Sequence, residues 1–178
     1  CALWVGRDGH LFRDGVAVAD VGGEVSLLLA ARDGTIWAAA SDGLHRIARA
    51  TVSVVGARLD GRPVILSALH ESRDGSIWMV GIEGVVGRWS AGGLQMTKSG
   101  RVLTAIAEPA PGEILLGTFG GLARLGSLPG EGLRPLTSGP KMETSLLALD
   151  RDSMLWCGAR DSLHVGQLGA WRVVASHD

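Results

Sequence analysis

Cysteine and long apolar runs are both scarce in this sequence, and each scarcity excludes a class of protein. Among 178 residues only Cys1 and Cys157 are cysteines, which is too few for a disulfide framework, and neither belongs to a Cys-x-x-Cys pair of the kind that binds metals. The apolar runs, such as Leu27 to Ala31, fall far short of the roughly 18 residues of a membrane-spanning helix. We therefore expect no metal, no other cofactor and no direct insertion of this segment into a membrane.

An excess of charge of one sign is missing as well. The 17 basic and 18 acidic residues nearly cancel, and neither end of the chain carries a charged tail. Proteins that bind nucleic acid display a basic patch or stripe, so nucleic acid is not an expected partner. Hydrophobic residues make up 46% of the sequence and charged residues 20%, which excludes intrinsic disorder, and the 27 glycines indicate many turns.

The sequence does contain a repeat. A tryptophan preceded by a short polar turn and followed six residues later by Gly-Leu or a similar pair recurs every 33 to 41 residues, 38 on average. Leu115 takes the tryptophan position in one copy, and the first copy is truncated. The five copies occupy residues 3–11, 32–44, 73–85, 111–122 and 151–163.

Each repeat unit is predicted to form four short strands, because short apolar runs alternate with turn residues and helical periodicity is absent. In one unit the predicted strands are 26–31, 35–40, 44–48 and 51–55. Asp33-Gly34 and Asp74-Gly75 separate the first two strands of their units. We expect them to form two-residue hairpin turns, in which both central residues have positive φ.

A single four-stranded sheet of this size cannot bury both faces, so such sheets must stack on one another, and a β-propeller stacks them radially. The predicted fold is therefore all-β, a β-propeller of four-stranded antiparallel blades; a sandwich or solenoid fits the fixed repeat less well. The units are a partial blade at 1–23 and blades at 24–60, 61–100, 101–140 and 141–178. About five blades are present, the first lacks its opening strand, and we expect them to be a fragment of a larger, seven-bladed ring.

The repeated motif resembles the two-component regulator propeller repeat, which forms the sensor region of bacterial signalling proteins. The resemblance rests on residues 4–6, 33–37, 74–78, 116–118 with 121–122, and 155–158. Leu115 and Ala39 depart from the tryptophan and glycine of the repeat. The resemblance implies a periplasmic, ligand-sensing module within a membrane signalling receptor that ends in a histidine kinase or cyclase, with a small molecule such as a glycan as ligand.

A second, weaker resemblance is to the streptogramin lyases, of which virginiamycin B lyase is one. It rests on the Asp-Gly-x-x-Trp repeats and on the segment 84–88, Gly-Val-Val-Gly-Arg. It implies a propeller enzyme that eliminates across a carbon–oxygen bond, but no matching catalytic histidine or metal-binding acid is found. A protein-interaction scaffold is a third hypothesis. The sequence favours a non-catalytic sensor over both.

Residues that recur in every unit are interpreted as structural. Trp37, Trp78 and Trp156 are expected to pack between blades, whereas Trp89 and Trp171 do not recur and are expected near the rim as candidates for a partner surface. Asp33, Asp74 and Asp152 lack the ligand series of a calcium loop and are assigned to turns.

A ligand must be recognised by residues that differ from blade to blade. The loops between second and third strands are polar and varied, as are the connections around 60–62 and 140–143. An arginine there suits carboxylates or sugar hydroxyls, and a phenylalanine can stack on a ring. His70 is added because leucine or alanine holds the corresponding position in the other units. The candidate ligand-binding residues are Arg7, Asp8, Ser41, Asp42, His70, Glu83, Phe119, Arg160 and Asp161.

Overall fold

The computed structural model describes residues 2–49, 51–126 and 132–176, which form strands, turns and connecting segments. None of these residues forms a helix that could cross a membrane. Cys157 is buried with a free thiol whose pKa is raised by its burial. The other cysteine, Cys1, lies outside the described residues.

The strands form one three-stranded sheet, four four-stranded sheets and a small hairpin, all antiparallel. The first sheet contains β1 (Trp4–Arg7), β2 (His10–Arg13) and β3 (Val16–Asp20). The second contains β4 (Val25–Ala30), β5 (Ile36–Ala40), β6 (Gly43–Ala48) and β7 (Thr51–Val54). The third contains β10 (Leu66–Glu71), β11 (Ile77–Gly81), β12 (Val85–Ser90) and β13 (Gly93–Lys98).

The fourth sheet contains β14 (Leu103–Ala110), β15 (Glu113–Thr118), β16 (Gly121–Leu125) and β17 (Leu133–Pro135). The fifth contains β18 (Thr144–Leu149), β19 (Leu155–Ala159), β20 (Ser162–Gln167) and β21 (Ala170–Ser176). In every sheet the strands pair in sequence order, so each is a simple meander. The predicted four-stranded units are confirmed, and the first sheet has only three strands, as predicted for the truncated copy.

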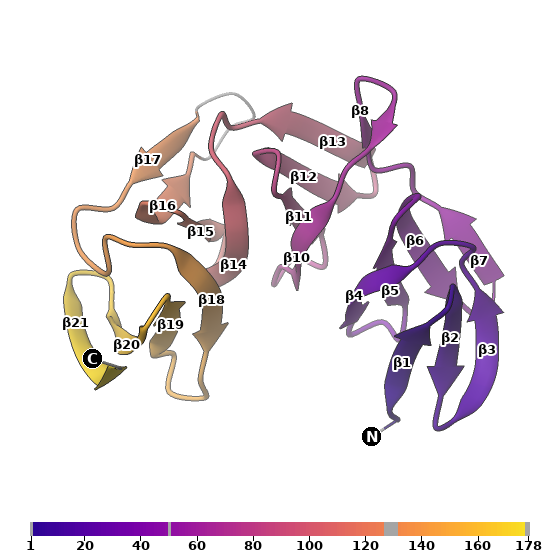
Figure 1. Cartoon of the computed structure of the whole chain (residues 1–178), viewed down its shortest axis with the longest axis horizontal. Coiled ribbons are helices and arrows are strands. Elements are labelled where there is room, and N and C mark those ends of the chain that lie inside the picture. The colour runs from indigo at the N-terminus through magenta and orange to yellow at the C-terminus, as the bar shows by residue number, and fades with distance from the viewer. Residues whose placement is uncertain (1, 50, 127–131, 177–178) are drawn as a thin grey trace.

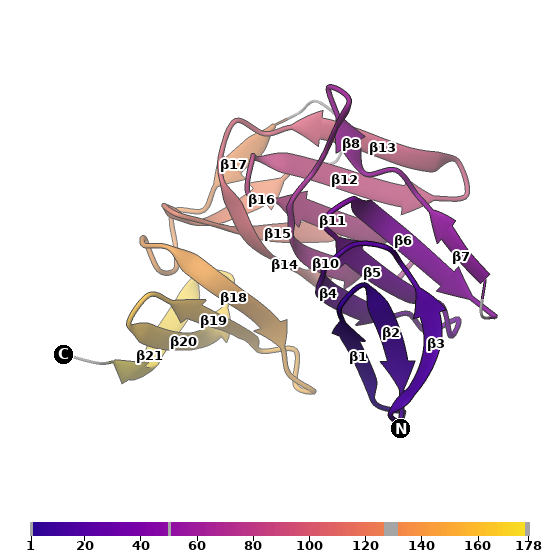
Figure 2. The same cartoon turned by 45° about the vertical axis from the view of Figure 1, so that its right-hand side comes forward.

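The sheets stand side by side around an open arc (Figure 1), with β4, β10, β14 and β18 on the concave side and the fourth strands on the outside. This is the blade arrangement of a β-propeller. A small hairpin of β8 (Arg58–Leu59) and β9 (Arg62–Pro63) interrupts the connection from the second sheet to the third. Figure 2 shows it beside the end of β13, where Lys98 Nζ lies 2.7 Å from Asp60 Oδ2.

The turns between first and second strands differ from the prediction. Gly34 and Gly75 have a φ of 83°, but Asp33 and Asp74 do not have positive φ, so the expected two-residue turns are wrong there. The amide of Gly34 donates to the carbonyl of Ala31 instead, which makes a type I turn closed by a left-handed glycine. The Asp33 side chain still stabilises the turn, because its Oδ1 accepts a hydrogen bond from the Thr35 amide at 2.8 Å.

Two-residue Asp-Gly turns do occur elsewhere in the chain. At Asp8-Gly9, Asp14-Gly15 and Asp60-Gly61 both residues have positive φ, between 50° and 83°. The last of these turns closes the β8–β9 hairpin and lies on the predicted boundary between units 24–60 and 61–100. The same dipeptide therefore forms two kinds of turn, depending on the strands that flank it.

The core lies between neighbouring sheets. Trp37 is 1% exposed and packs against Trp89 of the next sheet, their ring centroids 4.8 Å apart and their planes at 62°. Trp171 packs against the cluster around Leu115 and Cys157, between the fourth and fifth sheets. The expectation that Trp89 and Trp171 form a rim surface is therefore wrong, because both rings fill space between blades.

Two carboxylates, one buried and one partly buried, also join neighbouring sheets. Glu108 of the fourth sheet accepts hydrogen bonds from Ser72 Oγ at 2.8 Å and from the Arg73 amide at 2.7 Å, both in the third sheet's first turn. Glu71 of the third sheet accepts the amide of Arg32 in the second at 2.9 Å. The two glutamates hold corresponding positions, so this contact recurs from blade to blade.

Candidate functional site

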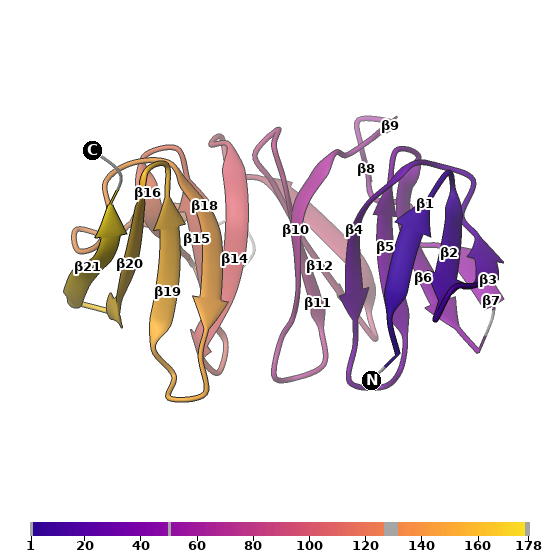
Figure 3. The same ribbon diagram turned by 60° about the horizontal axis from the view of Figure 1, so that its bottom comes forward.

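The turns between second and third strands lie at one end of the blades. Figure 3 shows the β1–β2 and β19–β20 turns at its upper end, and the turn from β18 to β19 at the opposite end. Eight of the nine candidate residues lie on or beside turns of this kind, which we call the upper end. These residues are Arg7, Asp8, Ser41, Asp42, Glu83, Phe119, Arg160 and Asp161.

A cavity of about 400 Å³ opens at the upper end between the first and second sheets. Its lining includes Arg7, Asp8 and the connection 22–24. Arg7 Nε lies 3.7 Å from Asp8 Oδ2, and both side chains are largely exposed. The sheets approach closely here, because a Cβ on Gly6 would lie 2.6 Å from Val25 Cβ. The cavity thus combines a glycine-lined wall with a guanidinium and two carboxylates, since Glu24 also lines it.

Ser41 and Asp42 lie directly behind the connection 22–24. The amide of Glu24 donates to Ser41 Oγ at 3.2 Å, and a Cβ on Gly23 would lie only 2.7 Å from Asp42 Oδ1. Asp42 Oδ1 is also 2.8 Å from Nε2 of His45, whose side chain is buried. Ser41 and Asp42 therefore position the wall of the cavity, and His45 fixes the carboxylate of Asp42.

The remaining upper-end candidates are spread along the arc, outside the lining of this cavity. Glu83 lies in the turn before β12, and Phe119, which is 58% exposed, lies in the turn before β16. Arg160 and Asp161 are exposed in the turn before β20, where the Arg160 amide donates to the carbonyl of Glu143 at 3.1 Å. Glu143 belongs to the connection 140–143, so that segment and the β19–β20 turn meet as expected.

His70 does not join the other candidates. Its partner across the β10–β11 pair is Trp78, and β10 ends one residue later, at Glu71, before the turn at the lower end, opposite to the candidate loops. His70 Nε2 lies 3.7 Å from Glu108 Oε2, whose side chain is 2% exposed. Burial lowers the pKa of His70, although the charges of Glu108 and Glu71 act in the opposite direction. These contacts place it in the interface between the third and fourth sheets.

The connection 22–24 was missed as part of the site, although the sequence contains a usable signal. Gly22 has a φ of 75°, and Gly23 has no room for a side chain beside Ser41 and Asp42. A Gly-Gly pair shortly before a predicted first strand indicates such a close approach of backbone to a neighbouring loop. Its carboxylate neighbour, Glu24, could then have been placed beside Arg7.

The arrangement suits a polar, uncharged ligand. A guanidinium donates hydrogen bonds and a carboxylate accepts them. A sugar hydroxyl can do both, so it can pair with either group. Within residues 2–49, 51–126 and 132–176, no three His, Cys, Asp or Glu side chains are grouped so as to hold a metal ion.

Comparisons with known proteins establish the fold. No protein-family model matches the sequence, and no curated protein matches it. A structure described as the extracellular domain of a hybrid two-component system, BT3049 from B. thetaiotaomicron, is similar with a TM-score of 0.77 at 16% identity, over 98% of this chain and 27% of that chain. The present chain thus spans about a quarter of that domain's length.

Two other solved structures are similar over nearly all of this chain. PorZ, a surface component of the type-IX secretion system of Porphyromonas gingivalis, has a TM-score of 0.73 at 12% identity, over 99% of this chain and 32% of that chain. XC5397, a gluconolactonase from Xanthomonas campestris, has a TM-score of 0.70 at 14% identity, over 98% and 72%. The chain therefore has the fold of a β-propeller, and its resemblance to two-component sensor propellers extends to the three-dimensional structure.

Proposed function

We propose that the chain is a ligand-sensing module in the extracytoplasmic, periplasmic part of a bacterial signalling protein, and that it is not catalytic. The observation that carries the proposal is the cavity at the upper end between the first and second sheets, where Arg7, Asp8 and Glu24 meet. Likeness to the extracellular domain of a hybrid two-component system supports the cellular setting.

The proposed ligand is a small hydroxylated molecule, with a glycan as the leading candidate. One guanidinium and two carboxylates line the cavity, so it offers both donors and acceptors to a neutral molecule with several hydroxyls, whereas an anion would meet an excess of negative charge. The ligand would contact two sheets at once. Its binding would favour one relative arrangement of these sheets, and differential affinity for two arrangements is what a receptor needs to transmit a signal to the rest of its chain.

The test is a binding screen of the chain against neutral mono- and oligosaccharides, with affinity measured by isothermal titration calorimetry. For a sugar that binds, we expect Arg7→Ala and Asp8→Ala each to weaken affinity about tenfold or more, since each leaves a ligand hydroxyl unpaired. The control is Arg13→Ala, which removes an arginine from the lower end of the same sheet. Loss of affinity in the control alone, or no binding of any sugar, would overturn the proposal.

An enzymatic function is the second candidate, because the gluconolactonase structure is similar over most of its own length. We would incubate the chain with glucono-δ-lactone and a divalent cation and follow acid release, and would assay elimination from a streptogramin in parallel. The sensor proposal would give way to an enzymatic function under one result. This is turnover faster than with the cation and no protein, provided that the Asp8→Ala variant loses it. Selective binding of a macromolecule, with no small-molecule binding, would instead favour a scaffold.

A further inference from the structure

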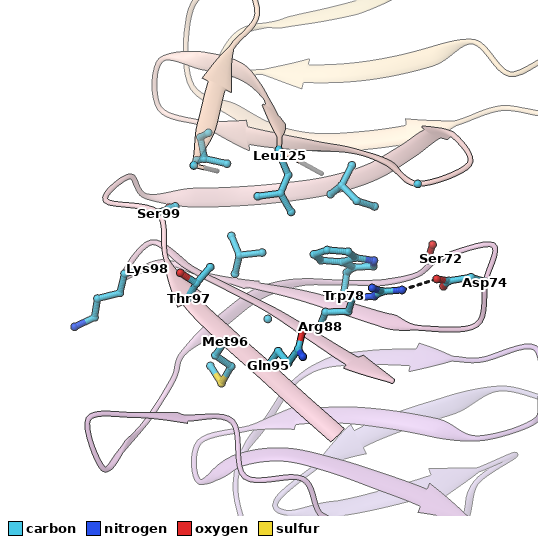
Figure 4. Close-up of a pocket in the computed structure, with 17 residues that line it drawn as sticks. Ser72, Asp74, Trp78, Arg88, Gln95, Met96, Thr97, Lys98, Ser99 and Leu125 are labelled. Carbon is cyan, nitrogen blue, oxygen red and sulfur yellow. Dashed lines mark hydrogen bonds and ion pairs between the residues drawn. The ribbon is translucent and has the colours of Figure 1, made fainter. Parts of the chain in front are cut away.

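A second cavity lies between the third and fourth sheets, toward the outer strands. It encloses about 280 Å³ between β12 and β13 on one side and β15 to β17 on the other. Figure 4 shows the ring of Trp78 in the gap between the two sheets, with Leu125 on the facing strand. This groove contains none of the residues of the upper-end site.

The neighbouring interface shows what fills the same place there. Arg88 pairs with Trp78 across β11 and β12, and Arg124 pairs with Leu115 across β15 and β16, so the two arginines hold corresponding positions. The residue after each arginine points toward the preceding sheet: Trp89 packs against Trp37. Leu125 packs into the cluster that includes Trp78. An indole at one interface is thus replaced by a smaller leucine at the next, and the groove is the space that remains.

The arginines on the third strands show how the two interfaces differ where Leu125 takes the position of Trp89. At the second and third sheets, the guanidinium of Arg46 lies over the Trp89 ring at 5.6 Å. At the third and fourth sheets, the corresponding Arg88 lies over Trp78 itself at 5.4 Å and is 2.6 Å from Asp74 Oδ2. Arg88 is therefore held at the edge of the groove. There it can contact an aromatic ring that occupies the position corresponding to that of Trp89 between the second and third sheets.

The lining decides the chemical class of the ligand. Val86, Ile114, Leu125 and Leu133 contribute aliphatic walls, whereas the polar groups, such as Gln95, belong to the third sheet. A sugar could use the polar groups of the third sheet, but its hydroxyls on the other side would face the aliphatic side chains of the fourth sheet without hydrogen-bond partners, which is unfavourable. A flat aromatic ring loses nothing there and gains the edge-to-face contact with an indole that Trp37 and Trp89 already display.

We propose that this groove is a binding site for a small, neutral, planar aromatic molecule of about the size of indole, which lies between Trp78 and Leu125, meets the Trp78 indole edge to face and contacts the guanidinium of Arg88. The site is separate from the upper-end cavity and does not depend on the proposed sensor function. The ligand would lie against Trp78 as the Trp89 ring lies against Trp37 at the neighbouring interface.

The test uses indole as the probe and saturation-transfer NMR with the whole chain. For a ligand this small we expect a dissociation constant on the order of 0.1–1 mM. Leu125→Trp places in the groove the side chain that fills the neighbouring interface, and it should abolish saturation transfer to indole. Leu125→Phe fills the groove partly and should weaken binding about tenfold. Methyl α-glucopyranoside should not displace indole from the wild-type chain.

The control is Val54→Trp, which adds an indole on an outer strand at a position that is 63% exposed, and it should leave indole binding unchanged. Equal binding by wild type and a folded Leu125→Trp or Leu125→Phe variant would overturn the proposal, as would absence of binding by the wild type. Arg7→Ala should leave indole binding intact, so a failure of this site and a failure of the upper-end site are distinguishable.

Discussion

The indole of Trp37 meets that of Trp89 edge to face across two sheets, with ring centroids 4.8 Å apart. Trp37 belongs to the repeated motif and Trp89 does not, so the pair joins a residue of the repeat to one that is specific to this interface. A blade sheet has two faces to bury, and this pair, with Leu44, Met79 and their neighbours, closes the space between the second and third sheets.

Replacing Trp37 with alanine removes the largest side chain of this interface. Because the ring is 1% exposed, we expect Trp37→Ala to lower the free energy of unfolding by about 3–5 kcal/mol, measured by urea denaturation. Trp156 holds the corresponding position in the fifth sheet but is only half-buried, so Trp156→Ala is the matched comparison and should cost less. Equal losses in the two variants would contradict the assignment of Trp37 to an inter-sheet core.

Glu108→Ala should be among the most destabilising polar substitutions. It leaves the Ser72 hydroxyl and the amides of Arg73 and Gly112 without their acceptor, and we expect a loss of about 3 kcal/mol at pH 7. Ser53→Ala, at an exposed hydrogen bond within one sheet, is the control and should change stability by less than about 1 kcal/mol.

The effect of Glu108 should also depend on pH. Burial alone raises the pKa of Glu108, but the hydrogen bonds from Gly112, Arg73 and Ser72 outweigh it, so the pKa lies below the ordinary 4.5. A carboxyl with a lowered folded-state pKa stabilises the fold above its unfolded pKa, and this contribution is lost as pH falls through the folded value. The stability difference between wild type and Glu108→Gln should therefore shrink below about pH 4.5. A difference that stays constant from pH 7 to pH 3 would refute this.

Asp74 should titrate at an unusually low pH. The hydroxyl of Ser76 donates to Asp74 Oδ1 at 2.6 Å, and this bond, the Ser76 amide and the Arg88 charge lower the pKa of Asp74 to about 2. Ser76→Ala removes the strongest of these contacts, so the pKa should rise toward the ordinary aspartate value when followed by carboxyl NMR. Ser72→Ala, in the same turn, contacts Glu108 instead and should leave the Asp74 titration in place.

Ser153→Gly should stabilise the chain. Ser153 has a φ of 60° in the turn where Gly34 and Gly75 stand in other blades, and a side chain in this left-handed region is strained. We expect a gain of about 0.5–1 kcal/mol in the free energy of unfolding, because glycine adopts this φ without that cost. Ser145→Gly, in strand β18, is the control and should destabilise. A loss of stability in Ser153→Gly would show that this turn is not strained.

Much of the fold could be predicted from spacing alone. The recurrence of the tryptophan position, at Trp37, Trp78 and Trp156, gave the number of units and the place of the second strand in each, because a repeated sequence forms a repeated structure. The turn type could not be predicted in this way. Asp33-Gly34 and Asp8-Gly9 contain the same dipeptide, but five residues separate the flanking strands in one case and two in the other.

The sequence by itself determined the all-β class, the blade unit and the end of the blades at which the varied loops lie, because these follow from local patterns repeated along the chain. The tertiary structure alone decided which loops meet. It brought Arg7 and Asp8 to the connection 22–24, separated His70 from them, and left a groove beside Trp78 where Leu125 replaces an indole. Such contacts join different blades, and their geometry depends on side-chain volumes across an interface rather than on spacing within a repeat.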